Sequence, residues 1–480
     1  MLFSAVRPPG FSGKNRRAVN DGEQMTAADR KKLHPELIPV ILSLAAPTMF
    51  EELVDTAVQY IDIAMVGSLG TAATAAVGAT ATISWLVGGT FSAIGIGFLS
   101  YIAKSRGAGN DENAARASAQ AVFVALFTGL LFSAIVLPLA RFVPGWMHAD
   151  VSIRPLAARY FLILYSTMLF RSARIIFGTL LRASGDTRTP MRIGLLVNLL
   201  NVVGNFFLIY PTRELAALGG MRVFGAGMGV EGAALASAAS VAVGGILVTV
   251  ALWRSKSVSP RGHSLKPDPE ILRPCLRVSL PNMFQRFCTS LGYVVFASMI
   301  NSLGELSTAA HTIANTVESA FYIPGYGMMA AAATLTGNCI GAGDRQRQKD
   351  LANMILLIEI SLMAVTGGLL LIFAPAMMGI FSRDAAVIAL GSTVLRMVAV
   401  SEPFYGVSIV TEGMLQGAGL TFKPFLFNLI GMWGVRIVGT TICLRLGYGL
   451  VSAWCCMIAH NMLLLILLRI YYRKVFPAQK

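Results

Sequence analysis

Long apolar runs, separated by short polar segments, follow one another along most of the chain. Each run is long enough to cross a bilayer, which takes about 20 helical residues. Backbone groups in lipid must be paired within a helix or a closed barrel, and these runs are too long for barrel strands, so we predict helices. The twelve predicted spans cover roughly residues 37–66, 73–101, 115–140, 156–182, 190–210, 230–253, 274–300, 308–338, 350–374, 387–415, 424–444 and 449–470.

The second half of the chain repeats the first at a constant distance. Pro47 recurs as Pro281, which is 281 − 47 = 234 residues later, and Gly107 recurs as Gly341 at the same distance. Further pairs at this distance are Gly109 and Gly343, Leu181 and Leu415, and Pro190 and Pro424. Each half holds six predicted spans, an even number, so both halves insert with the same orientation. We therefore expect a pseudo-two-fold axis along the membrane normal.

These patterns predict an all-α integral membrane protein with twelve transmembrane helices in two six-helix lobes. A polar, basic segment precedes the first span, and a segment rich in proline and charge separates the two sets of six. The predicted organisation is a cytoplasmic basic tail at 1–35, an N-terminal lobe at 36–254, a cytoplasmic linker at 255–272, a C-terminal lobe at 273–472 and a cytoplasmic tail at 473–480.

Composition and charge support a membrane protein rather than a nucleic-acid partner. Apolar residues make up 55% of the chain and charged residues 13%, against about 25% charged residues in soluble domains. The mean hydropathy is +0.66. The net charge is +15, but most Lys and Arg fall in the tails and in loops on one side of the predicted spans. This is the positive-inside pattern, and it predicts a cell (inner) membrane protein with both termini cytoplasmic.

Three acids in the first span form a polar stripe. Glu51, Asp55 and Asp62 lie within about 40° of one another at 100° per residue, and Gln59 lies close to them. A charge at the bilayer centre costs about 2.5–3.5 kcal/mol, so this stripe should face protein or water. The second half has Gln285, Thr289 and Phe296 at the corresponding positions.

The scaffold is thus repeated without the acids, which favours a protonatable or cation-binding role for them in the first lobe. We predict Asp62 as the ion-coupling residue, with Asp55 as a second candidate, and Glu51 and Gln59 as candidates for the substrate cavity. The alternative is a salt bridge between an acid and a membrane arginine, for which Arg171, Arg174 and Arg286 are the candidates. Glu52 is assigned to a structural pair with Arg286.

Further polar residues accompany the stripe. Asn201 and Asn205 lie four residues apart on one face of the fifth span, so their amides either coordinate a small cation, bond to Asp62 or join helices. Asn198, in the same span, and Glu318, where the first half has Ser84, are candidates for the substrate cavity. Pro47 and Pro281 remove a backbone N–H and predict helix kinks that can act as switches.

No motif for an enzyme occurs. The chain contains neither GxxxxGK[ST], HExxH nor DDxxD, so no nucleotide site, zinc protease or prenyl transferase is indicated. We therefore expect a protein that is not an enzyme, uses no cofactor and takes its energy from an ion gradient.

Several segments together resemble the multidrug and toxic compound extrusion transporters. The first-span segment from Pro47 to Gly67 contains Asp62 fifteen residues after the proline, as in that family. The other matching segments are 185–190 (GDTRTP), Asn201-x-x-x-Asn205, 229–234 (GVEGAA), 321–327 (FYIPGYG) and 341–344 (GAGD). The resemblance extends over nearly all twelve spans and implies a V-shaped, two-lobed exchanger of drugs for cations or protons.

In prokaryotic members of that family, the first-helix Asp acts with an Asn and an Asp in the fifth helix and a Thr in the sixth. The corresponding positions here are Asn201, Asn205 and Ser237, so the second acid is missing. The resemblance therefore implies a coupling site at Asp62, Asn201, Asn205 and Ser237. The absent acid favours protons over sodium as the coupling ion, or a replacement by Asp55 or Glu51. A sodium site at Asp62, Asn201 and Asn205 is the alternative.

The implied function is secondary active efflux of organic, cationic or amphipathic compounds in exchange for H⁺ or Na⁺, by alternating access. The expected partners are small toxic compounds and the lipid bilayer, with no nucleic acid, and we expect a monomer. The alternative is a lipid-linked saccharide flippase of the same wider superfamily. The charge of the central cavity distinguishes the two, because acids favour cationic drugs and arginines favour lipid phosphates.

Overall fold

The computed structural model describes residues 34–147, 149–215 and 221–477. The predicted basic tail therefore lies almost wholly outside the described residues, as do the last three residues of the C-terminal tail.

Helices make up most of the described chain. The first half contains α1 (Ile38–Gly67), α2 (Thr71–Gly107), α3 (Asp111–Leu139), α4 (Val143–Trp146), α5 (Arg154–Tyr165), α6 (Met168–Ala183), α7 (Arg188–Ile209) and α8 (Gly229–Arg254), with a 3-10 turn at Pro35–Leu37. The second half contains α9 (Pro269–Asn301), α10 (Glu305–Ala342), α11 (Arg345–Phe381), α12 (Ala385–Gly417), α13 (Phe422–Leu429), a π-helical segment (Ile430–Ile437), α14 (Val438–Arg445) and α15 (Leu450–Val475).

The membrane class predicted from the sequence is confirmed at a coarser level. In the described parts of the chain, nine helical segments are long and apolar enough to cross a membrane, or ten if a bent pair is one span. That pair is α5 and α6, which replace the predicted fourth span and meet at a bend of 50°. The predicted eleventh span is one continuous segment, Phe422–Arg445. The more polar helices α9 and α10 are not among the nine.

One element departs from the all-α prediction. After α7, strands β1 (Pro211–Leu215) and β2 (Met221–Ala226) form an antiparallel hairpin, with Arg213 opposite Val223. The Thr212 hydroxyl and the Gly225 backbone bond to each other across it. This segment has no counterpart in the second half, where the corresponding connection between α14 and α15 is short. The sequence indicated an inserted loop here but not its strands.

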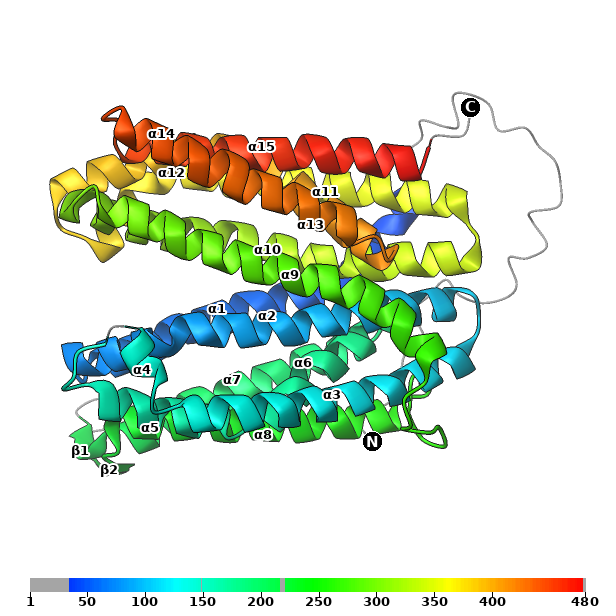
Figure 1. Ribbon diagram of the computed structural model, residues 1–480, viewed down its shortest axis with the longest axis horizontal. Helices are drawn as coiled ribbons and strands as arrows, with labels where there is room; N and C mark the ends of the chain where they lie inside the picture. Colours follow the sequence, from blue (N-terminus) through cyan, green and yellow to red (C-terminus); the bar gives the residue numbers. More distant parts are fainter. Residues whose placement is uncertain (1–33, 148, 216–220, 478–480) are drawn as a thin grey trace.

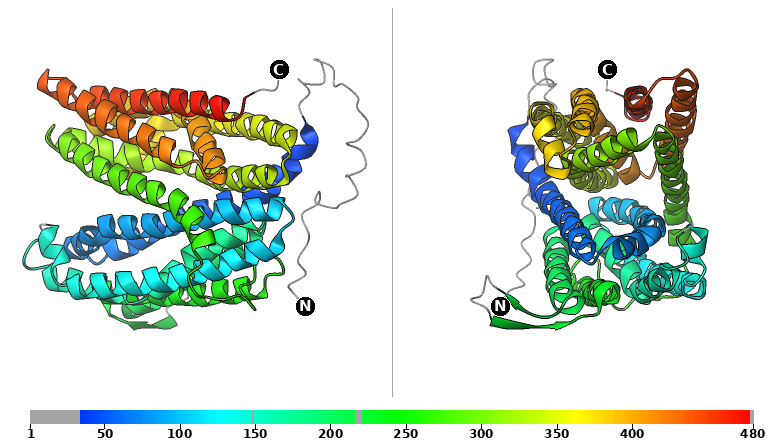
Figure 2. Two further views of the ribbon diagram at one scale, coloured as in Figure 1. Left: turned by 45° about the vertical axis from the view of Figure 1, so that its right-hand side comes forward. Right: turned by 90° about the vertical axis from the view of Figure 1, so that its left-hand side faces the viewer.

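The two halves form two adjacent helix bundles. In Figure 1, α1 to α8 make up one bundle and α9 to α15 the other. Helices of the two bundles come together at the end where α9 begins and α15 finishes, which we call the closed end. They diverge toward the end that holds α4 and the β-hairpin, which we call the divergent end (Figure 2, left).

The first helix of each half packs its initial turns into the opposite bundle. Leu37 of the preceding 3-10 turn and Ile41 and Leu44 of α1 belong to a buried cluster formed mainly by α10, α11, α12 and α15. In the same way, Ile271 and Cys275 of α9 belong to the buried core of the first half. Because apolar burial is the main favourable term in packing, these turns attach each half to the other at the closed end.

Two glycines allow α2 and α10 to touch at the closed end. A Cβ added at Gly107 would lie 1.9 Å from the Asn338 carbonyl oxygen, and one at Gly341 would lie 1.9 Å from the Lys104 carbonyl oxygen. Gly341 and Asn338 stand 234 residues after Gly107 and Lys104, since 341 − 107 and 338 − 104 both equal 234. The same contact is therefore made twice, once by each repeat.

Candidate functional site

Four of the predicted coupling residues meet between α1, α7 and α8. The Asn205 amide nitrogen donates to Asp62 Oδ1 at 2.6 Å. With the Asn201 amide oriented so that its nitrogen faces the carboxylate, it donates to Asp62 at 2.8 and 3.0 Å, and its oxygen accepts from the Ser237 hydroxyl at 2.9 Å. This orientation gives every donor an acceptor, and the opposite one does not. The Asp62 carboxylate is thus held by two amides from α7.

A second acid of the stripe bonds to α7 two helical turns away. The Asn198 amide nitrogen donates to Asp55 Oδ1 at 2.5 Å. Arg174 of α6 forms an ion pair with the other oxygen of Asp55 at 3.6 Å. The salt bridge that the sequence left open as an alternative is therefore present at Asp55. It neutralises an acid that the sequence offered as a second coupling residue.

The third acid is engaged by an arginine that the sequence analysis missed. Arg182 of α6 donates to Glu51 Oε2 at 2.7 Å, and the Glu51 side chain is only 9% exposed. Gly194 of α7 makes room for it, because a Cβ there would lie 2.9 Å from Glu51 Oε1. Arg182 follows Arg171 by eleven residues, or about 20° around a helix, so helical periodicity could have placed it on the same face.

The remaining predictions for α1 have mixed outcomes. Glu52 forms no direct ion pair with Arg286 among the described residues, although the charge of Arg286 is close enough to act on it. Gln59 is exposed and has no hydrogen-bond partner in the described chain. Its neighbour Tyr60 reaches the other bundle, where its hydroxyl lies 3.2 Å from the Thr316 carbonyl oxygen. The middle of α1 therefore touches α10 close to the depth of Asp62.

Pro47 is the one interior proline of α1, and its effect is visible in the contacts. Proline lacks the N–H that would bond to the Ser43 carbonyl, four residues earlier. The Thr187 hydroxyl, which precedes α7, donates to that carbonyl at 3.3 Å. In α9, which contains Pro281, the repeat counterpart Thr421 donates to the Val278 carbonyl at 2.8 Å, one residue beyond the Arg277 carbonyl that corresponds to that of Ser43.

The acids of the second half lie apart from Asp62. Glu318 is buried in α10, with 4% exposure, and its neighbourhood includes Arg436 rather than the residues of the α1 stripe. Glu359 and Glu402 are fully buried, and neither has a hydrogen-bond partner in the described chain. The second bundle thus has its own interior acids, which the acid stripe of the first bundle does not contact.

The Asp62 cluster offers one carboxylate, two amides and the Ser237 hydroxyl. The side-chain oxygen of Asn205 is buried and has no partner in the described chain. Among the described residues, no group of three or more His, Cys, Asp or Glu could hold a metal ion. A small cation prefers oxygen ligands, whereas the amides of Asn201 and Asn205 present nitrogens to Asp62. A sodium ion bound at Asp62 would require these amides to turn their oxygens toward it.

A mainly helical membrane fold of two repeated bundles, with an acid paired to amides inside the first, is typical of a membrane transporter. The family model MatE matches residues 47–207 and 281–442, which are more than half of the chain. The chain therefore belongs to the multidrug and toxic compound extrusion family. The two matched segments begin 281 − 47 = 234 residues apart, which confirms the internal repeat read from the sequence.

Known proteins resemble the chain over most of its length. It is 26% identical to the probable multidrug resistance protein NorM of Thermotoga maritima, over 88% of this chain and 90% of that protein. It is also 26% identical to the multidrug resistance protein PmpM of Pseudomonas aeruginosa, over 83% and 82%.

Two solved structures show the same fold. A transporter of the MOP superfamily from Pyrococcus furiosus superposes with a TM-score of 0.83 at 23% identity, over 95% of this chain and 99% of that one. An outward-facing multidrug resistance MATE transporter gives 0.83 at 24% identity, over 91% and 95%.

Proposed function

We propose that this protein is a proton-driven exporter of organic, cationic or amphipathic compounds. In this proposal all twelve predicted spans cross the cell membrane, including α9 and α10. The two six-helix lobes are related by a pseudo-two-fold axis along the membrane normal, which the repeated Gly107 and Gly341 contacts support. One chain contains both lobes, so a monomer suffices. The closed end faces the cytoplasm, in keeping with the basic residues there.

The observation that carries the proposal is the bonding of Asp62 to Asn205 and Asn201. These two amides donate to an ionised carboxylate, and such charge-assisted bonds are stronger than neutral ones. A proton on Asp62 replaces an acceptor by a donor, which weakens the bonds to both amides. Protonation would therefore loosen the outer part of α1 from α7, and α1 can then move relative to its inner turns about Pro47.

The described state corresponds to a transporter open to the outside. Its bundles meet at the closed end and diverge at the other, and one of its structural neighbours is an outward-facing MATE transporter. In the proposed cycle, a proton from outside reaches Asp62, α1 moves, and the bound compound leaves at the divergent end. Deprotonation toward the cytoplasm then restores the bonds to α7.

The acid stripe of α1 also favours the proposal that the transported compound is cationic or amphipathic. Glu51 and Asp55 are neutralised by Arg182 and Arg174, so only Asp62 among the three retains an unpaired negative charge. Two of the membrane arginines are thereby occupied, which weighs against a phosphate-binding cavity and the saccharide flippase. A shared fold does not fix the cargo, since the structural neighbour from Pyrococcus furiosus is described as having a binding pocket of reverse polarity.

The test uses the purified protein reconstituted in lipid vesicles and measures the transport of a fluorescent organic cation out of them. An anionic dye of similar size is the comparison. An imposed inward proton gradient should drive export of the cation, and Asp62→Asn should abolish this. Replacing potassium by sodium at a fixed proton gradient should leave the rate unchanged. Normal pumping by Asp62→Asn would refute the coupling role, and export of only the anionic dye would refute the cargo class.

A further inference from the structure

A cavity of about 240 Å³ lies at the closed end, away from the Asp62 cluster. Its walls come from the last turns of α2, the first turns of α9 and the loop after α12. The lining residues include Ser100, Tyr101, Lys104, Arg273, Arg277 and Gly419. Three of these six are cations, and none of the residues that line the cavity is acidic.

The positive charge of the cavity has no counter-charge in the described chain. Lys104, Arg273 and Arg277 form no ion pair there. Lys104 Nζ donates to the Ala418 carbonyl at 2.7 Å, at the C-terminal end of α12. That bond satisfies one of the three ammonium donors and leaves the charge in place.

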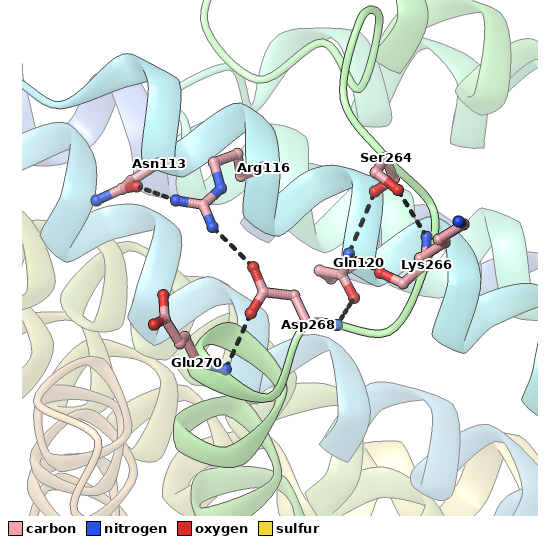
Figure 3. Close-up of polar contacts among 7 residues, drawn as sticks. All are labelled: Asn113, Arg116, Gln120, Ser264, Lys266, Asp268 and Glu270. Carbon is pink, nitrogen blue, oxygen red and sulfur yellow. Dashed lines mark hydrogen bonds and ion pairs between the residues drawn. The ribbon is translucent and has the colours of Figure 1, made fainter.

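The acids nearest to these arginines in sequence do not supply the missing charge. Asp268 accepts from Arg116 of α3 at 2.8 Å and caps α9 through the Glu270 backbone N–H at 3.0 Å. The Gln120 side chain fixes the same segment, because it accepts from the Asp268 N–H at 2.9 Å. Figure 3 shows this arrangement, in which Asp268 points to Arg116. Glu270 forms no ion pair in the described chain. No acid in the described chain therefore offsets the charge of these three cations.

A stripe of exposed residues along α9 continues from the cavity. Arg273, Arg277, Leu280, Phe284 and Phe287 lie within about 80° of one another at 100° per residue. The two arginines are exposed, and the three apolar side chains are 44%, 53% and 49% exposed. The stripe thus begins with two cations at the closed end and continues with apolar side chains toward the membrane centre.

We propose that this cavity and stripe bind an anionic phospholipid from the leaflet at the closed end. The phosphate occupies the cavity, where Arg273, Arg277 and Lys104 donate to it, and an acyl chain lies along Leu280, Phe284 and Phe287. Arginine forms paired bonds to phosphate oxygens, and basic pockets between membrane helices bind lipid headgroups. A free phosphate would use only the cations, and the exposed apolar side chains next to them favour a lipid.

The bound lipid would also favour one conformation. Lys104 belongs to the first half and Gly419 to the second, so the cavity is complete only while the two halves meet at the closed end. The Ser100 hydroxyl, which donates to the Gly417 carbonyl at 3.0 Å, ties the same two elements. The lipid therefore stabilises the state described here and slows opening at this end.

The test is a titration of the full-length protein in neutral detergent with short-chain phosphatidylglycerol, with bound lipid counted by native mass spectrometry. Short-chain phosphatidylcholine and inorganic phosphate serve as the comparison probes. Each cation near a headgroup contributes about 1 kcal/mol, so Arg273→Gln with Arg277→Gln should weaken phosphatidylglycerol binding roughly 30-fold. The matched control is Arg345→Gln with Lys474→Gln, which removes two exposed cations elsewhere at the same end and should retain wild-type affinity.

Three outcomes would overturn the proposal. Unchanged phosphatidylglycerol binding by the Arg273/Arg277 double variant would exclude the cavity, and equal losses in both double variants would indicate a nonspecific charge effect. Saturation by inorganic phosphate at the same affinity would show a free-anion site. If the glutamine double variant does not fold, two other double variants test the site. Arg273→Lys with Arg277→Lys keeps the charge and should bind phosphatidylglycerol within about threefold of wild type. Phe284→Ala with Phe287→Ala should weaken the binding of the lipid but not that of inorganic phosphate.

Discussion

At the scale of single residues, the first bundle contains a ladder of acid–amide pairs. Asp55 bonds to Asn198 and Asp62 bonds to Asn205, and both partners are 143 residues later, since 198 − 55 and 205 − 62 are equal. Seven residues are close to two helical turns, so α1 and α7 run parallel and present matching faces. The two steps of the ladder differ in charge, because Arg174 reaches Asp55 but not Asp62. In the proposed function, the pair of Asp62 and Asn205 is therefore the outer step of this ladder and the one that changes protonation.

A second acid at the outer step should change the coupling ion. Asn205→Asp would place another carboxylate where an amide nitrogen now lies 2.6 Å from Asp62. Two carboxylates this close cannot both ionise without a cation, so the pair should keep a proton to higher pH or bind sodium. We expect sodium to stimulate transport by Asn205→Asp and to shift its pH profile back down.

The measurement is vesicle transport with and without sodium over a range of pH. Asn198→Asp is the matched control, because its new acid would lie beside Asp55 and Arg174 and should gain no sodium response. A wild-type-like profile for Asn205→Asp in both ionic conditions would contradict the role assigned to the outer step.

Glu51 forms an ion pair with Arg182, and the second half of the chain has uncharged residues at both corresponding positions. Glu51 and Arg182 correspond to Gln285 and Gln416, since 285 − 51 and 416 − 182 both equal 234. Both glutamines donate to Glu412, at 2.7 and 3.2 Å. Glu51→Gln leaves a buried guanidinium unpaired, which should cost about 3–5 kcal/mol.

The double substitution Glu51→Gln with Arg182→Gln removes both charges and gives the first half the two glutamines of the second, although Glu412, which they bond there, corresponds to Gly178 here, since 412 − 234 = 178. We expect it to recover most of the stability that Glu51→Gln loses. Thermal unfolding in detergent, followed by the fluorescence of a thiol-reactive dye, measures both variants. A double variant no more stable than the single one would show that the cost does not come from the unpaired arginine.

At the scale of elements, the two helices that cross between bundles each carry a proline. In α1 the turns before Pro47 pack in the second bundle, while Asp62 lies against α7 of the first. Pro47 therefore lies between the part of α1 that packs in the second bundle and the part that bonds to the first. Thr187 satisfies the Ser43 carbonyl that the proline leaves without its usual partner.

This relation predicts a specific coupling between Pro47 and Thr187. Thr187→Val should destabilise the protein by about 1 kcal/mol, because a buried carbonyl loses its hydrogen bond. In a Pro47→Ala background the new N–H can bond to Ser43, so the same Thr187→Val change should cost less by at least about 0.5 kcal/mol. The free energies of unfolding of the wild type, the two single variants and the double variant give the coupling energy between Pro47 and Thr187. Strictly additive effects would show that the hydroxyl and the proline act independently.

Sequence patterns predicted the acid face of α1 correctly, but they did not predict the break in the neighbouring helices α5 and α6. Helical periodicity placed Glu51, Asp55 and Asp62 on one face, and all three indeed turn toward α6 or α7. The break between α5 and α6 was not predicted, since neither Ser166 nor Thr167 is a helix breaker. Arg182 was missed because it stood at the predicted end of a span. Tertiary packing, which local pattern does not encode, decides such features.

At the scale of the whole molecule, the repeat predicted two equivalent bundles but not which end would be closed. The 234-residue register relates residues within the chain, and the same register is compatible with either open state. Side-chain contacts settle the question for the described state. The Ser100 hydroxyl donates to the Gly417 carbonyl at 3.0 Å, and its counterpart Thr334 reaches the Arg182 carbonyl at 3.4 Å. Both contacts join the bundles at the closed end.

The glycine contacts between α2 and α10 should control how often this end opens. A methyl group at Gly107 or Gly341 would overlap a backbone carbonyl of the opposite bundle, and a backbone can relieve the overlap only by moving the helices apart. Because the two contacts are equivalent in the repeat, Gly107→Ala and Gly341→Ala should act alike. Each should shift the population away from the described state.

Spin labels at Glu112 and Gln346, equivalent exposed positions beside the closed end, can report this shift as a distance distribution between the bundles. The labelled protein would have its native cysteines replaced. Both alanine variants should lengthen the mean distance, and their combination should lengthen it further. Gly88→Ala is the control, since a Cβ there meets nothing within 4 Å, and it should leave the distribution unchanged. A response to only one of the two contacts would mean that the halves, although repeated in sequence, do not share the closure equally.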